Sequence, residues 1–252
     1  MLLLFLACGP PKAPERFEDM MDFGFRHFDG DVRAMQDLGD KMIPWMEDHF
    51  ELTSEGYEIT PLTAEDLDTT GLDVRIDAEI IGVVAGVDYR HGMDPVMRAM
   101  TWPDQQDIFD SYAEFERTTD DDLDCFLSGD CEFLRTQDYS RQEPGAGLEF
   151  STTYFSDFRR LELEDGTPVM LQRILSPDPV EFNVDWVEVH QQYGFSYLYV
   201  RDDGSTRRVQ AIWADGQVAG TDAADGAHLT IAINSIQAAA EDLDAWLDTQ
   251  EE

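Results

Sequence analysis

The feature that most constrains the fold of this 252-residue chain is a long amphipathic segment near its C-terminal end. Apolar residues recur there at spacings of three and four, which is the period of one helix face. They are Leu229, Ile233, Ile236, Ala240, Leu243 and Leu247. Such a helix is stable when its apolar stripe lies against another apolar surface. The partner of matching size is the region just before it, so the two should pack together.

The region from about residue 150 to 219 is predicted to form successive antiparallel strands. Turn residues separate its apolar segments, and the Asp-Gly pairs at 165 and 203 are typical of hairpins. The apolar alternation slips between Trp186 and Val187, which predicts a β-bulge. Together with the terminal helix, this pattern predicts an α+β fold in which an antiparallel β-meander packs against the helix.

The N-terminal part, from about residue 17 to 117, is predicted to be mainly helical. Apolar residues recur at helical spacing over residues 35–49, although Pro44 should kink or end that helix. Residues 72–87 alternate at first and then become continuously apolar, which favours a buried strand, or two strands bent at Gly82 or Gly86. Residues 94–117 return to helical spacing, with a break at Trp102-Pro103. We therefore expect a helical part ahead of the strands and the long terminal helix.

A meander of antiparallel strands followed by one long helix resembles the START-like, helix-grip domains. The resemblance covers about residues 72–250 and rests on the order of the elements. It implies a curved sheet that wraps the C-terminal helix and leaves an apolar ligand cavity between them. An α+β domain whose helix packs directly on the sheet, with no cavity, satisfies the same pattern.

This resemblance makes the aromatic residues of neighbouring strands candidates for lining the cavity. The candidates are Trp186, Phe195, Tyr197, Tyr199 and Trp213. The sequence does not show which face of the strands points inward. An ordinary packed core needs large aromatic residues as well, so that alternative stays open.

The first residues form a short apolar run, MLLLFLA, that ends at Cys8 and is followed by Gly-Pro-Pro. This resembles the signal of bacterial lipoproteins, in which the cysteine is acylated and becomes the new N-terminus. Phe5 stands where the family has leucine, and no Lys or Arg precedes the run. The run is too short to cross a bilayer, which takes about twenty residues. The alternative is the frayed apolar terminus of a cytoplasmic protein.

The lipoprotein resemblance implies the organisation of the chain and its location. Residues 1–7 would be a removed signal, residues 8–16 a lipidated tether, and residues 17–252 one α+β domain. Within that domain the helical part covers about 17–117 and the strand-rich part with its terminal helix about 150–250. The lipid on Cys8 would hold the domain on a membrane of the cell envelope, periplasmic or surface-exposed.

The two remaining cysteines, Cys125 and Cys131, are separated by a Ser-Gly-Asp turn sequence. Such a pair is able to close a small disulfide loop in an oxidising compartment. Two further ligands for a zinc site are missing at suitable spacing. Two independent buried thiols are the alternative.

The charge of the chain indicates its surroundings. Acidic residues outnumber basic ones 54 to 17, for a net charge of −37, and 34 of the acids are Asp. Like charge of this density destabilises a compact state unless salt screens it. The composition is typical of proteins adapted to saline surroundings, and it argues against binding nucleic acid or anionic lipid surfaces.

No catalytic or phosphate-binding motif is present in the sequence. Glu188 and His190 are able to share a sheet face, either as an acid–base pair or as a surface ion pair. His91 lies in a polar segment that reads as a solvated turn. The acids of residues 120–124 lack the glycine that a calcium loop needs at its sixth position, where Cys125 stands. We expect no metal, no cofactor and no enzyme activity.

These observations lead to two hypotheses about function. The first is a lipid-anchored, non-catalytic binding module for an apolar or lipid-like small molecule. The alternative is a structural or protein-interaction lipoprotein of the cell envelope without a ligand.

Overall fold

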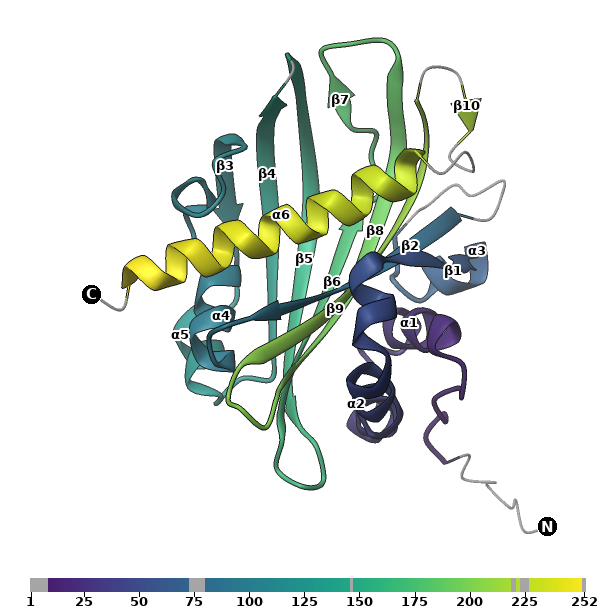
Figure 1. Ribbon diagram of the computed structural model, residues 1–252, viewed down its shortest axis with the longest axis vertical. Coiled ribbons are helices and arrows are strands. Elements are labelled where there is room, and N and C mark those ends of the chain that lie inside the picture. Colours follow the sequence, from purple (N-terminus) through teal and green to yellow (C-terminus); the bar gives the residue numbers. More distant parts are fainter. Residues whose placement is uncertain (1–8, 73–79, 146, 219–220, 223–226, 251–252) are drawn as a thin grey trace, which may run out of the picture.

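The computed structural model describes residues 9–72, 80–145, 147–218, 221–222 and 227–250 (Figure 1). In this part of the chain ten strands form one sheet in the order β1-β2-β9-β8-β6-β5-β4-β3, with β10 beside β9 and β7 beside β5. The strand pairs are antiparallel. The predicted α+β class, with an antiparallel sheet, a long C-terminal helix and N-terminal helices, is confirmed.

The strands are β1 (Tyr57–Leu62), β2 (Ile80–Tyr89), β3 (Tyr112–Thr118), β4 (Phe133–Gly145), β5 (Leu148–Glu162), β6 (Pro168–Ser176), β7 (Glu181–Phe182), β8 (Val187–Val200), β9 (Thr206–Val218) and β10 (Thr221–Asp222). The helices are α1 (Phe17–Arg26), α2 (Val32–Glu55), α3 (Ala64–Asp68), α4 (Met93–Met100), α5 (Leu123–Ser128) and α6 (Ala227–Gln250), with a 3-10 turn, η1 (Gln105–Asp107).

The two faces of the sheet are covered by different helices. Side chains alternate between the faces along each strand. On β8 and β9 one set, including Phe195 and Trp213, packs against α1 and α2, and we call this side the α1 face. The other set, including Leu198, packs in a second core with α4, α5 and α6, and we call this side the α6 face. Figure 1 shows α6 crossing the strands on that side.

The core of the α1 face is built from the aromatic and methionine side chains of α1 and α2. Two glycines allow these helices to approach the strands closely. A side chain at Gly24 would collide with Phe195, and a side chain at Gly39 would collide with Tyr197 and Leu163. The close approach therefore depends on the sequence of both helices, and it buries the aromatic side chains of β8 completely.

Three details of the predicted elements are wrong. Residues 94–117 are not helical throughout, because α4 ends at Met100 and the later part becomes the edge strand β3. Pairing with β4 decides this, and local spacing does not show it. Pro44 lies inside α2, and the non-helical backbone occurs at His49 instead. The bulge was predicted between Trp186 and Val187, but it lies between Val189 and Gln191, inside one long strand β8.

The segment expected to be a tether contacts the domain. The backbone N–H of Ala13 donates to the Asp37 carboxylate of α2 at 2.7 Å. Lys12 pairs with the same carboxylate at 3.0 Å, and Lys41 of α2 pairs with Glu15 at 2.7 Å. Residues 12–15 therefore lie against α2. The expected signal, residues 1–7, and Cys8 lie outside the described residues.

A pair of carboxylates joins α1 to α3. Asp22 on α1 is 7% exposed, and its neighbour Asp66 belongs to the first turn of α3. Arg26 contacts both, at 2.8 Å from Asp22 and 3.2 Å from Asp66. Burial, followed by the charge of Asp66, raises the pKa of Asp22 to about 7, and the charge of Arg26 opposes the shift. The folded state therefore holds a proton on Asp22 that the unfolded chain releases at lower pH.

The raised pKa predicts how stability responds to pH. A group whose pKa is higher in the folded state stabilises it below the unfolded pKa, and this stabilisation is lost as pH rises through about 7. The side chain of Asp22→Asn stays neutral at every pH. The free energy of unfolding of this variant, relative to that of the wild type, should therefore rise by about 1 kcal/mol or more between pH 5 and pH 8. Urea unfolding at both pH values measures this. Asp48→Asn, which removes an exposed charge of α2, is the control, and an equal response from both variants would contradict the assignment.

Candidate functional site

Helix α6 is held near its C-terminal end and at its middle. Near its C-terminal end Asp244 and Asp248 accept from Arg90, which follows β2, at 3.1 Å and 2.8 Å. His91 lies beside them, 7% exposed, with Nε2 3.1 Å from Asp248, so it is buried and not in a solvated turn. At the middle of the helix Gln237 donates to the Ser54 carbonyl of α2 at 2.7 Å. These contacts fix the path of α6 across the sheet.

Helix α6 packs on β2, β9 and α4. The α6 face of the more distant strands can be read row by row, because residues paired across antiparallel strands point to the same side. One row is Asp138, Tyr154, Ser176, Gln192 and Ala214. The next is Thr136, Ser156, Ile174, Gly194, Ile212 and Val83. We call these two rows the polar rows, since polar side chains make up most of the first row and the β4 and β5 end of the second.

The polar rows are buried in some places and open to solvent in others. Asp138, Thr136 and Ser156 are at most 1% exposed. Ile174 and Ile212 are partly exposed, although they lie on β6 and β9 in the middle of the sheet. Partial exposure of apolar side chains on central strands means that α6 does not close this part of the face. Solvent, or a ligand, is therefore able to reach the polar rows.

Hydrogen bonds order the side chains at the β3 end of these rows. Arg117 donates from Nε and Nη2 to Asp138 at 2.8 Å each, and Ser156 donates to the same carboxylate at 3.2 Å. Burial raises the pKa of Tyr112 and of Tyr154, which share a hydrogen bond. Both hydroxyls therefore stay protonated at neutral pH. This arrangement is able to orient polar groups of a bound molecule.

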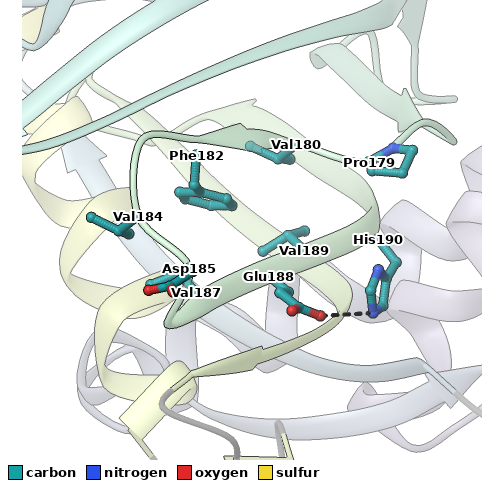
Figure 2. Close-up of a pocket in the computed structure, with 9 residues that line it drawn as sticks. All are labelled: Pro179, Val180, Phe182, Val184, Asp185, Val187, Glu188, Val189 and His190. Carbon is teal, nitrogen blue, oxygen red and sulfur yellow. Dashed lines mark ion pairs between the residues drawn. The ribbon is translucent and has the colours of Figure 1, made fainter.

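A hollow of about 300 Å³ opens where the sheet meets the β7–β8 hairpin (Figure 2). Its lining is Pro179, Val180, Phe182, Val184, Asp185, Val187, Glu188, Val189 and His190. Phe182 pairs with Phe150 in the register, and their rings lie 5.4 Å apart. Phe150 in turn pairs with Gln142, and both lie on the same side as Asp138 and Tyr154, each four residues away along its strand. The apolar hollow therefore continues the α6 face beyond the polar rows.

Glu188 and His190 lie at the rim of this hollow. Their side chains are 3.8 Å apart and about half exposed, at 58% and 49% (Figure 2). Solvent screens such an ion pair strongly. The geometry matches a surface ion pair, which was one of the two interpretations of the sequence.

The aromatic residues predicted to line a cavity beneath the C-terminal helix are elsewhere, so that prediction is corrected. Phe195, Tyr197, Tyr199 and Trp213 are at most 1% exposed and lie on the α1 face, against α1 and α2. Trp186 is 50% exposed, between β7 and β8. Strand alternation places the four buried residues on one face, but the helices that cover this face are decided by tertiary packing.

Sequence reasoning did not single out the polar rows. Their signal is present in the strands, where polar residues such as Ser156, Ser176 and Gln192 each stand next to a large apolar one. Polar alternation is normally a sign of a solvated face. The tertiary structure leaves this face partly open while burying Asp138, Thr136 and Ser156.

The cysteines and the acidic cluster form a structural unit at α5. Cys125 and Cys131 are joined by a disulfide with Cα atoms 5.2 Å apart. The Asp122 carboxylate caps α5 by accepting from the backbone N–H of Cys125 at 3.0 Å. Asp121 accepts from the backbone N–H of Arg135 at 2.7 Å. Among the described residues no group of three His, Cys, Asp or Glu side chains is arranged to hold a metal ion.

No family model matches this chain, and no curated protein matches its sequence. Solved structures with some likeness include human StAR-related lipid transfer protein 5, with 9% identity, a TM-score of 0.41, and coverage of 88% of this chain and 98% of that one. The lipid transfer and protein localization domain of human StarD13 has 11% identity, a TM-score of 0.42, and coverage of 82% and 95%. A norcoclaurine synthase from Thalictrum flavum has 12% identity, a TM-score of 0.42, and coverage of 71% of this chain and 100% of that one. Likeness at this level supports no inference about function.

The corrected position of the aromatic residues predicts unequal effects of two tryptophan substitutions. Trp213 is fully buried, donates from Nε1 to the Thr60 carbonyl at 2.9 Å and lies 5.7 Å from the Phe25 ring. Trp213→Ala should lower the free energy of unfolding by about 3–5 kcal/mol. Trp186→Ala, at the exposed site, should change it by about 0.5 kcal/mol or less. Urea unfolding in high salt compares them, and a similar loss from both would contradict the placement.

Proposed function

We propose that this chain is a non-catalytic binding module that holds a small amphipathic molecule between α6 and the sheet. One observation carries the proposal: the α6 face of the central strands is partly open and joins buried polar groups to an apolar hollow. A structural protein with no ligand would be expected to close such a face with apolar packing.

The chemistry of the two parts defines the class of ligand. Apolar atoms of a ligand fit the hollow, where Phe182, Val187 and Val189 lie, and the space beside Ile174 and Ile212. A purely apolar molecule over the polar rows would leave hydroxyl and amide groups without partners, which is unfavourable. A lipid-like molecule with a polar group satisfies both parts.

Gly194 provides room for a ligand at the centre of the face. It lies between Ile174 and Ile212 in the second polar row. A Cβ atom built on Gly194 would meet nothing nearer than the Ile174 Cβ at 3.4 Å and the Ala211 carbonyl at 3.5 Å. A longer side chain would therefore extend from the α6 face at this point and would occupy the position proposed for the ligand.

The first test is a search for a bound molecule and its removal by Gly194→Leu. The full chain, purified in high salt from its own host, should carry one small amphipathic molecule in native mass spectrometry. Gly194→Leu should reduce the bound fraction about tenfold or more, because the leucine fills the site. Circular dichroism would establish that the variant is folded.

Thr153→Leu is the matched control, since it adds the same side chain at an exposed position of β5 on the other face. It should keep the ligand. A wild-type chain that is empty, both as isolated and after incubation with an extract of the host lipids, would favour the interaction protein of the cell envelope instead.

We also propose that the module is exported and anchored by a lipid on Cys8. The disulfide between Cys125 and Cys131 supports an oxidising location. The acidic, lysine-poor composition supports a saline one. Within the described ranges no helix is long and apolar enough to span a membrane.

Cys8→Ser tests the anchor directly. The wild-type chain should sediment with membranes and carry the mass of the acyl groups, whereas Cys8→Ser should be found in the soluble fraction of the exported protein. The disulfide should remain in both, seen as a mass two protons below that of the reduced chain. Membrane association that is the same for both proteins would contradict the anchor.

A further inference from the structure

Arg208 lies on the α6 face, two rows beyond Gly194. Its Nε and Nη2 donate to the Ser196 hydroxyl at 3.1 Å and 3.0 Å, and Nη2 also donates to Gln172 at 2.9 Å. Its Nη1 donates to the Tyr89 hydroxyl at 3.2 Å. The residue is 9% exposed. These partners are neutral, so the hydrogen bonds orient the guanidinium without neutralising its charge.

The absence of a carboxylate sets Arg208 apart from the other deeply buried arginine side chains of the described chain. Each of four others pairs with a carboxylate at 2.6–2.8 Å: Arg117 with Asp138, Arg159 with Glu132, Arg173 with Asp157, and Arg207 with Asp88. Within the described residues no ion pair includes Arg208. A chain with 54 acidic and 17 basic residues could supply a carboxylate at nearly any position, so its absence here is informative.

An unneutralised guanidinium in this position destabilises the empty protein. Arginine keeps its proton in proteins, so it cannot escape burial by becoming neutral. Removing its charge from water is costly unless an opposite charge lies nearby. Arg208 also has one N–H on Nη1 that the four hydrogen bonds to described residues do not use. An anion bound at the guanidinium would use that donor and balance the charge.

The position of Arg208 connects this charge to the proposed site. Ser196 and Gln172, which hold the guanidinium, occupy the row next to Gly194 and Ile174. A molecule lying over Gly194 would therefore have one end at Arg208. The other end would extend along β8 towards the apolar hollow at Val187 and Val189.

We propose that Arg208 binds the carboxylate of an amphipathic ligand, so that the ligand is an organic monoanion such as a fatty acid. This inference rests on the proposed function and adds the chemical class of the polar group. One guanidinium surrounded by neutral hydroxyl and amide groups matches a single negative charge. A phosphate with two charges would lack a second cation here, and the net charge of −37 would oppose its entry.

The test compares two probes that differ only in the polar end, octanoate and octan-1-ol. The full chain carrying Cys8→Ser, which adds no acyl group of its own, is titrated with each by calorimetry in high salt at neutral pH. Octanoate should bind about tenfold or more tighter than octan-1-ol, since hydrogen bonds to charged groups are the stronger ones.

Arg208→Gln should remove this preference by weakening octanoate about tenfold or more while leaving octan-1-ol within about twofold. Arg141→Gln is the matched control, because it removes one positive charge from a side chain paired with Glu114, Glu143 and Glu149 on β3, β4 and β5. It should keep the preference for octanoate.

The outcomes separate this inference from the proposed function. Equal binding of both probes by the wild type would overturn the carboxylate assignment and leave the binding module standing. Binding of neither probe, together with an empty native protein, would contradict both. If Arg208→Gln does not fold, the wild-type comparison of the two probes still decides the assignment.

Discussion

The rest of the structure depends on one constraint, which is that a sheet with both faces covered needs two different packing partners. The α1 face receives the large aromatic side chains of β8 and β9 and is closed by α1 and α2, which approach closely at Gly24 and Gly39. Because this side supplies a dense apolar core, the α6 face is free to carry polar groups at its centre. Helix α6 then packs mainly along β2, β9 and α4.

The charged residues of the interior are arranged mostly as close arginine–carboxylate pairs. Fifty-four acidic residues oppose seventeen basic ones, and several of the arginines are placed inside the protein in close pairs with carboxylates. Buried pairs are not strongly stabilising by themselves, but losing one partner is costly. Arg208 departs from this arrangement, and it does so beside the open part of the α6 face. A site for a carboxylate accounts for both observations together.

Particular elements show how far the sequence could be interpreted. The spacing of Ile236, Ala240 and Leu243 predicted α6, and these residues do form its buried stripe. Strands β5, β6, β8 and β9 were predicted from turn residues and alternation, whereas the two-residue β7 was not. Strand β3 was missed, because a short edge strand is defined by its partner β4 rather than by its own spacing. Strand β4, between the acidic cluster and the strand-rich region, was not predicted either.

The sequence alone determined the class of fold, the order of most elements and which residues of a strand share a face, because these follow from local periodicity. Tertiary structure alone decided which helices cover each face. It placed Phe195, Tyr197, Tyr199 and Trp213 under α1 and α2, and it placed Ser196 and Arg208 on the α6 face. Periodicity carries no information on this choice, since rotating the sheet by half a turn leaves the pattern unchanged. The contacts of helices distant in sequence remove that ambiguity.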